Sequence, residues 1–326
     1  SMHTTLTRTC WSILVSTGLA TQPVAAQERG PDAQAWTAPR TAWGAPNLQG
    51  IWDYRTLTPL ERPDQFGGRE FLSPEEVADL EQQRRDRPDG RPPGDARTAP
   101  SVHAPYWLDY GTRAVSSGRS SLIVDPLDGR IPALSPAGLQ RASQRTVRRE
   151  ERGPADAPSD RNLWERCITR GLPNGMLPAG YNNNIQILQT QAHVVILNEM
   201  IHDARIVPID AEPAGGAGLA DGMGQWRGDS RGHWDGDTLV VTTTNFSASA
   251  DFRGAADNLR LVERFRLTDP HTLDYTFTVT DPTTWTAPWT ATYPIERIDG
   301  PMYEYACHEG NYGLLNILTA ARVNQP

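Results

Sequence analysis

The feature that most constrains the fold is a succession of short strand-like segments in the C-terminal half of the chain. From residue 184 onward, segments rich in β-branched and aromatic residues alternate with turn residues, as in NIQILQT, HVVILNEM, ARIVPID, HWDGDTLVVTTTNF, LRLVERFRLTD, HTLDYTFTVTD and WTATYPIERI. About seven or eight such segments in order are typical of an antiparallel meander that closes into a barrel or a strongly curled sheet. Asp235 and Gly236 form a strong signal for a tight hairpin between two of them. We therefore predict a mainly β fold, with a barrel domain over residues 161–326 that ends in a short helix at GLLNILTAAR.

The part of the chain before this barrel has a different composition. Residues 27–160 are rich in proline, glycine and arginine, and the whole chain holds 27 prolines and 28 glycines, which favours turns over long helices. Two helix starts stand out, because Ser73 and Ser135 each precede a proline as N-cap residues do. We predict an irregular wrapping segment over residues 27–160, with two short helices and a strand near residue 120 that joins the barrel.

The first residues have the pattern of a secretory signal. Arg8 supplies a positive charge, CWSILVSTGLA at 10–20 is a short apolar stretch, and VAA at 24–26 places small residues before a cleavage point. We interpret Ser1, which precedes Met2, as a cloning remnant. The apolar stretch is too short for a bilayer, which needs roughly 20 residues. We expect residues 1–26 to be a signal peptide that is removed, leaving a soluble, secreted, periplasmic protein without membrane insertion.

Charge and cysteine content narrow the partners and the covalent structure. The formal net charge is -8 and no long basic tract is present, so nucleic acid is not an expected partner. Once Cys10 leaves with the signal, Cys167 and Cys307 remain, an even number in a compartment that favours oxidation. We predict a disulfide between them, with free thiols as the alternative. The bond would contribute about 4 to 5 kcal/mol in the chain-entropy model.

Alternation along the strands predicts which side chains share the barrel interior. In residues 259–267 and 273–281 apolar residues occupy every second position, and Glu263 falls on the same face as they do. A short connection at residues 269–271 would set Glu263 opposite Phe277 and diagonal to Tyr275. Residues 289–297 would add Trp289 and Tyr293. An apolar lining with a few polar groups is typical of a small-molecule cavity.

The groups on this face are suited to acid–base chemistry. An ionised carboxylate on an apolar face must either be paired or have a raised pKa, and a raised pKa suits a general acid or base. We predict Glu263 or His308 as the base, Tyr275 or His202 as the acid, and Arg205 as the group that stabilises an oxyanion or enolate. The structural alternative is an ion pair between Glu263 and an arginine, with three candidates: Arg205, Arg231 and Arg297.

Further polar and aromatic residues complete the predicted site. The predicted substrate-binding residues are Tyr181, Asn183, Trp289, Tyr293 and Glu309, with turn and packing roles as the alternative. His202, His233 and His308 with a carboxylate could bind a divalent metal, but their spacing matches no close-paired motif such as HExxH. The sequence also lacks GxSxG, phosphate-loop and dinucleotide-binding motifs. We therefore predict no resident metal or other cofactor.

Five strings together carry a resemblance: GAPNLQGIWDYRTLTPLERP, SSLIVDPLDGRIPALSP, ERCITRGLPNGMLPAGYNNNIQI, GDSRGHWDGDTLVVTTTNF and YEYACHEGNYGLLNIL. They resemble a widespread family of exported bacterial proteins of unassigned function, over most of the mature chain. The resemblance implies export and a single domain, and it carries over no catalytic residue. The meander is also similar in architecture to calycin barrels of the lipocalin type.

These observations lead to one prediction of function and two alternatives. Proton transfer is the chemistry that carboxylate, phenol and imidazole groups perform unaided, so we predict an exported, cofactor-independent lyase, hydratase or isomerase that acts on a small organic molecule. One alternative is a metal-dependent hydrolase with histidine ligands. The other is a non-catalytic, lipocalin-like protein that binds a small molecule in the barrel, in which case Glu263 would be held in an ion pair.

Overall fold

The computed structural model describes residues 36–86, 108–210 and 223–323. The predicted signal peptide at residues 1–26 lies outside the described residues, as do residues 27–35 and 87–107 of the predicted wrapping segment. The chain divides into two compact units, Ser1–Thr37 and Ala38–Pro326, and the second contains every helix and strand of the described residues.

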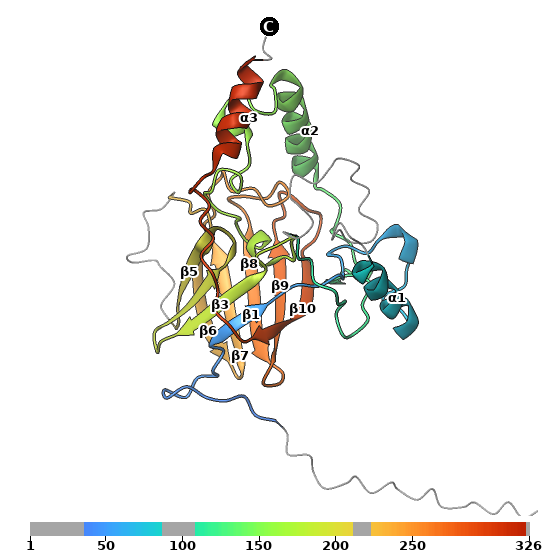
Figure 1. The fold of residues 1–326 in the computed structure, drawn as a ribbon, viewed down its shortest axis with the longest axis vertical. Helices are drawn as coiled ribbons and strands as arrows, with labels where there is room; N and C mark the ends of the chain where they lie inside the picture. Colours follow the sequence, from blue (N-terminus) through green and yellow to red (C-terminus); the bar gives the residue numbers. More distant parts are fainter. Residues whose placement is uncertain (1–35, 87–107, 211–222, 324–326) are drawn as a thin grey trace, which may run out of the picture. The chain divides into compact units, whose positions relative to one another are not determined.

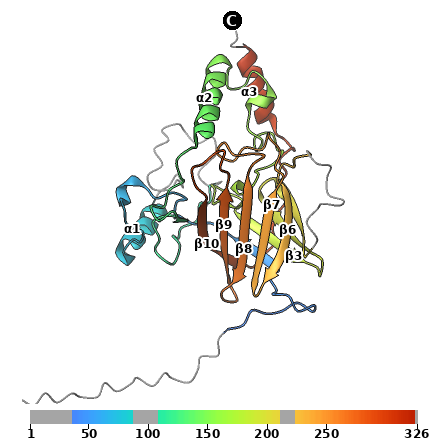
Figure 2. The ribbon, with the colours of Figure 1, turned by 180° about the vertical axis from the view of Figure 1, so that it is seen from behind.

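Ten strands of the described residues form one antiparallel sheet. The strands are β1 (Gly50–Asp53), β2 (Ile123–Asp125), β3 (Asn184–Gln189), β4 (His193–Asn198), β5 (Asp203–Pro208), β6 (Asp229–Asp235), β7 (Thr238–Thr244), β8 (Arg260–Leu267), β9 (Thr272–Thr280) and β10 (Trp289–Ile298). Their order is β5–β4–β3–β1–β10–β9–β8–β7–β6, and β2 pairs beside them with β10 (Figure 1). Figure 2 shows β10, β9, β8, β7 and β6 side by side from behind. The predicted mainly β, barrel-like fold is confirmed.

The strands form where alternation and turn residues predict them. Along β8 and β9 every second residue is buried, and Glu263 lies opposite Phe277 as the alternation predicts. The hairpin between β6 and β7 turns directly after the pair Asp235–Thr238, with Gly236 at a φ of 59°. Glycine reaches this left-handed conformation without the steric cost that a Cβ imposes, which suits a two-residue hairpin.

The two ends of the sheet, β5 and β6, come together and nearly close the barrel. Each strand of the path is antiparallel to the next, and the path has an odd number of strands, so its first and last strands run in the same direction. Ile209 and Gly232 form a parallel bridge there, and the Asp210 amide donates to the Gly232 carbonyl at 2.9 Å. A Cβ at Gly232 would lie 2.7 Å from Ile209 Cδ1 and 3.0 Å from Val207 Cγ1. The glycine therefore permits the close approach that joins the sheet edges.

The segment expected to wrap the barrel also supplies part of it. β1 comes from this segment and lies in the middle of the sheet, paired with β3 on one side and β10 on the other. β2 pairs with β10 through Ile123 and Asp125. The sheet therefore includes two strands that precede residue 161, and the buried Trp52 of β1 contributes to the same core as the later strands.

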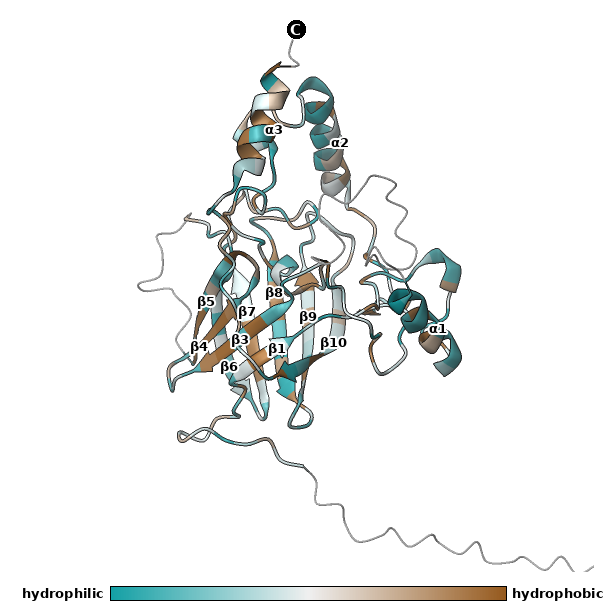
Figure 3. Ribbon diagram, in the orientation of Figure 1, coloured by the Kyte–Doolittle hydropathy of each residue, from teal (hydrophilic) through white to brown (hydrophobic). Residues whose placement is uncertain are grey.

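Three α-helices lie in the described residues: α1 (Pro74–Arg85), α2 (Pro136–Glu151) and α3 (Tyr312–Val323). α1 begins with the predicted capping box, in which Ser73 and Glu76 each accept from the other's backbone amide. The N-cap of α2 is Ser135, whose hydroxyl accepts from the Gly138 amide and donates to the Thr283 carbonyl before β10. Figure 3 shows α1 and α2 mostly in hydrophilic colours, as expected for helices with largely solvated surfaces.

Candidate functional site

Three of the predicted catalytic residues meet inside the barrel. Glu263 of β8 accepts two hydrogen bonds from the Arg205 guanidinium of β5, one of them between Nη2 and Oε1 at 3.0 Å. The Tyr275 hydroxyl of β9 donates to the same Oε1 at 2.8 Å. Glu263 and Tyr275 are fully buried and Arg205 is 5% exposed. Glu263 is therefore held in an ion pair, which is the structural alternative given above for this residue. Of the three candidate arginines, Arg205 is the partner.

The electrostatics of this group follow from burial and from mutual contact. Burial by itself lowers the pKa of Arg205, but the charge and hydrogen bonds of Glu263 outweigh it, and the pKa is raised. Burial raises the pKa of Tyr275 well above its ordinary value, and the negative charge of Glu263 adds to the rise. Arg205 therefore stays charged and Tyr275 stays neutral near neutral pH. A buried pair of this kind is stable only when both partners are present.

The predicted substrate-binding residues Trp289 and Tyr293 are core residues. The Tyr293 ring lies 5.4 Å from that of Tyr275, and the Trp289 ring lies 5.6 Å from that of Phe277. The Tyr293 hydroxyl donates to the Met176 carbonyl. Each of these four aromatic side chains is at most 2% exposed. These rings therefore pack against one another as core residues at positions where the alternation predicted a cavity lining, because side chains that share an apolar face on the paired strands β9 and β10 are neighbours.

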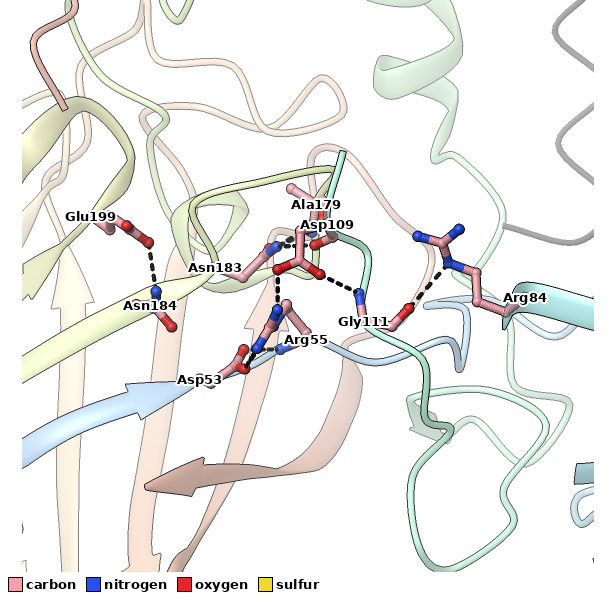
Figure 4. A network of polar contacts seen from close by, with 9 residues as sticks. All are labelled: Asp53, Arg55, Arg84, Asp109, Gly111, Ala179, Asn183, Asn184 and Glu199. Carbon is pink, nitrogen blue, oxygen red and sulfur yellow. Dashed lines mark hydrogen bonds and ion pairs between the residues drawn. The ribbon is translucent and has the colours of Figure 1, made fainter. Parts of the chain in front are cut away.

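Tyr181 and Asn183, which precede β3, have mainly structural contacts. The Asn183 amide oxygen accepts from the Ala179 amide at 2.7 Å, and its amide nitrogen donates to the carbonyls of Ala179 and Asp109 at 2.9 and 3.2 Å (Figure 4). The half-buried Tyr181 ring lies 6.2 Å from Trp164, and burial raises the pKa of its hydroxyl to about 12. The side chain of Asn183 thus stabilises the turn at residues 179–183. Tyr181 instead lies beside Trp164, which lines a pocket described below.

The remaining predicted site residues come from separate segments. His202 ends a single 3-10 turn at Met200–His202, His233 lies on the outer face of β6, and His308 and Glu309 lie in the loop before α3. Among the described side chains, Glu263 forms hydrogen bonds with Arg205 and Tyr275. Neither Glu263 nor Tyr275 forms one with His202, His233, His308 or Glu309 within the described residues. Within the described ranges, no group of three or more His, Cys, Asp or Glu side chains is placed to share a metal ion.

Cys167 and Cys307 form the predicted disulfide, with sulfur atoms 1.97 Å apart and Cα atoms 5.7 Å apart. Cys167 is buried, and the Asn311 side-chain amide donates to its sulfur at 3.3 Å. The bond ties the loop that precedes α3 to the segment that precedes β3. It therefore fixes the wall of the pocket that this second segment forms.

A pocket of about 720 Å³ opens near the barrel end where β7 stops and β8 starts. Its walls come from three places: Arg149 of α2, residues 159–174, and the loop 246–259 with Trp226 beside it. Four arginines line it, Arg149, Arg161, Arg166 and Arg170, against two aspartates, Asp160 and Asp251. The aspartates already accept hydrogen bonds, Asp160 from Arg152 and Asp251 from the Gly254 amide. The lining therefore carries an excess of positive charge.

Arg170 is the most distinctive residue of the pocket. Its guanidinium lies over the Trp164 ring at 5.1 Å, and its Nη1 is buried without a hydrogen-bond partner. It forms no ion pair with any residue that the structure describes. Burial lowers the pKa of Arg170, because no carboxylate compensates the lost hydration. Arg170 therefore contributes to the pocket wall a positive charge that no described carboxylate balances.

A second pocket, of about 680 Å³, lies between β1, the start of α1 and residues 109–118. Within its lining Arg55 pairs with both Asp53 and Asp109, as Figure 4 shows, and Asp109 also accepts from the Gly111 amide at 3.2 Å. Arg84 of α1 donates to the Gly111 carbonyl at 3.1 Å. These contacts fasten residues 109–111 to the barrel and to α1, so we interpret this region as structural.

Sequence reasoning missed the arginine-lined pocket. Its walls are loops that lie far apart in the chain, and alternation describes only strands. One local signal was available, because Arg161, Arg166 and Arg170 cluster with Trp164 around Cys167 in the string DRNLWERCITRG. No helix among the described residues is long and apolar enough to cross a membrane. No family model, curated protein or solved structure matches the chain.

Proposed function

We propose that the chain is an exported binding protein for a small organic anion, which occupies the pocket at the barrel end. The observation that carries the proposal is Arg170, a partly buried arginine whose Nη1 has no hydrogen-bond partner and no counter-charge among the described residues, in the wall of a pocket with four arginines and two aspartates. Removing a charged group from water is costly, and an anionic ligand would restore the hydrogen bonds and the charge balance that Arg170 lacks.

The pocket wall is rigid enough to select a ligand. The Cys167–Cys307 disulfide holds one wall, and Thr169 is anchored by a hydrogen bond from its hydroxyl to Asp203 at 2.8 Å. Trp164 supports the Arg170 guanidinium from one side. A guanidinium that is already positioned loses little conformational freedom on binding, so more of the interaction appears as affinity.

Binding, rather than acid–base catalysis, is the function that the geometry favours. The predicted base Glu263 and acid Tyr275 are fully buried and already bonded to each other and to Arg205. The carboxylates of the arginine-lined pocket serve local structure. The proposal therefore follows the non-catalytic alternative, with the ligand placed at the barrel end instead of inside the barrel as in a lipocalin.

Export is part of the proposal and has two supports. Disulfides persist in oxidising compartments such as the bacterial periplasm, and the Cys167–Cys307 pair is at bonding distance. The signal-like residues 2–26 and the resemblance to a family of exported bacterial proteins point the same way.

The test is isothermal titration of the folded chain with a panel of carboxylates and phosphate monoesters at fixed ionic strength, each paired with its uncharged amide or alcohol. The Arg170→Gln variant should bind the preferred anion about 10- to 100-fold more weakly, the range for a hydrogen bond to a charged group. The matched control is Arg148→Gln, which removes the same charge from an exposed position of α2 outside the pocket.

Arg148→Gln should leave the affinity within about twofold, because screened surface charges contribute little. The proposal fails if no anion of the panel binds more tightly than its uncharged partner, or if both variants weaken binding equally. Melting curves of both variants separate loss of binding from loss of folding.

A further inference from the structure

Trp226 is an exposed aromatic side chain at the edge of the arginine-lined pocket. It is 39% exposed, and it makes no ring contact with any other described residue. It lines this pocket and also a smaller one of about 300 Å³ beside it, which residues 203–206 and 225–230 help to form. A large exposed aromatic surface in a concave site is typical of a ligand contact.

The backbone around Trp226 is held firmly, although the indole itself is exposed. On one side, the Gln225 amide donates to the Asn245 carbonyl at 3.0 Å, and the Ser247 amide donates to the Gln225 carbonyl at 2.7 Å. On the other side, Arg227 donates to the Asp203 carbonyl at 2.7 Å. A Cβ at Gly224 would lie 2.7 Å from the Ser247 Cα, so glycine is needed for this close contact. The indole is therefore presented from a fixed frame.

Trp226 and Arg170 line the same larger pocket. Thr169 and Trp226 are the two residues shared by the walls of the larger and the smaller pocket, and Thr169 directly precedes Arg170. The apolar side chains of Phe246 and Phe252, from the loop after β7, line the same cavity. A charged group and a flat apolar surface thus belong to one site.

We infer that the ligand is an aromatic carboxylate, whose carboxylate pairs with Arg170 and whose ring stacks on Trp226. The inference rests on the proposed anion-binding function and adds the chemical class of the ligand. Arg170 recognises the carboxylate through charge-assisted hydrogen bonds. The indole of Trp226 favours a planar ring, because offset stacking adds attraction beyond the burial of apolar area.

The experiment compares three probes that differ in one property each. 2-Naphthoate is planar and charged, decahydro-2-naphthoate is charged but not planar, and 2-naphthamide is planar but uncharged. The folded wild-type chain should bind 2-naphthoate about three- to tenfold more tightly than decahydro-2-naphthoate, the range expected of one aromatic contact. It should bind 2-naphthamide more weakly still.

Two substitutions assign the preference for the planar ring. Trp226→Leu should bind the two carboxylates equally, whereas Trp226→Tyr keeps an aromatic face and should retain most of the preference. Trp43→Leu is the matched control, because Trp43 is also 39% exposed and lines neither pocket. It should behave as wild type.

The outcomes separate this inference from the proposed function. Equal binding of the two carboxylates by the wild-type chain, no binding of 2-naphthoate, or a preference that survives in Trp226→Leu would overturn the aromatic ligand class. In each case other anions of the panel can still depend on Arg170. A loss of Arg170 dependence for every anion would instead refute the proposed function.

Discussion

Replacing Glu263 by glutamine would leave Arg205 as a buried cation without a counter-charge. The substitution Glu263→Gln keeps the shape of the side chain and one oxygen that accepts a hydrogen bond, so the charge is the main property that it removes. The carboxylate now accepts two hydrogen bonds from Arg205 and one from Tyr275. The buried Nε of Arg205 already lacks a hydrogen-bond partner, so no nearby acceptor is in place to replace the lost carboxylate.

The expected loss is about 3 to 5 kcal/mol of unfolding free energy, the range for removing one partner of a buried ion pair. A loss of that size is a large part of the roughly 5 to 15 kcal/mol that stabilises a typical protein. Replacing the whole group by apolar residues, as Arg205→Met with Glu263→Leu and Tyr275→Phe, removes the charges together. This variant should lie within about 1 to 2 kcal/mol of wild type or be more stable, since neither charge of the Arg205–Glu263 pair is left buried without its partner.

Urea unfolding followed by tryptophan fluorescence measures these differences without any knowledge of the ligand. Tyr275→Phe alone is the control for the hydroxyl, and it should cost about 1 to 3 kcal/mol because its partner is charged. A Glu263→Gln variant within about 1 kcal/mol of wild type would refute the reasoning. It would also reopen the acid–base role that the sequence predicts for Glu263.

Two further predictions concern covalent structure and pH. Digestion without reductant should release one peptide pair linked through Cys167 and Cys307. Reduction should lower the free energy of unfolding by about 4 to 5 kcal/mol, because the bond joins residues 140 positions apart. Two alkylatable thiols in protein from an oxidising compartment would contradict the bond. Burial raises the pKa of Tyr181 to about 12, and it also raises the pKa values of Tyr54, Tyr275 and Tyr293. The folded state favours the neutral form of these tyrosines. Their contribution to stability is complete below about pH 10, where the same tyrosines are also neutral in the unfolded chain, and it is lost as the pH rises above that value. A phenolate absorbance step that coincides with loss of near-ultraviolet dichroism is expected, and ionisation of these four groups near about pH 10 in folded protein would disprove it.

Local patterns were sufficient for most of the elements and for much of the register, although they did not predict β1. The alternation in β8 and β9 placed Glu263 opposite Phe277, and the serines before α1 and α2 are the N-caps that the sequence indicates. The Asp235–Gly236 turn is also where it was predicted. These features depend on residues that are close in sequence, or directly opposite after a short turn, so they can be recognised without the rest of the chain.

The sequence by itself thus determined a mainly β chain with a buried Glu263, a pair of cysteines and a barrel-like meander. Only the tertiary structure decided that Tyr293 and Trp289 are core residues that pack against Tyr275 and Phe277, because the sequence pattern does not specify how the volumes of these rings fit together. The pairing of Glu263 with Arg205 likewise depends on the tertiary structure, because it requires β5 to lie across the barrel from β8. The pocket of Arg170 and Trp226 has the same origin: its walls come from residues 149–174, 226 and 246–259, and contacts between such distant segments arise only when the whole chain has folded.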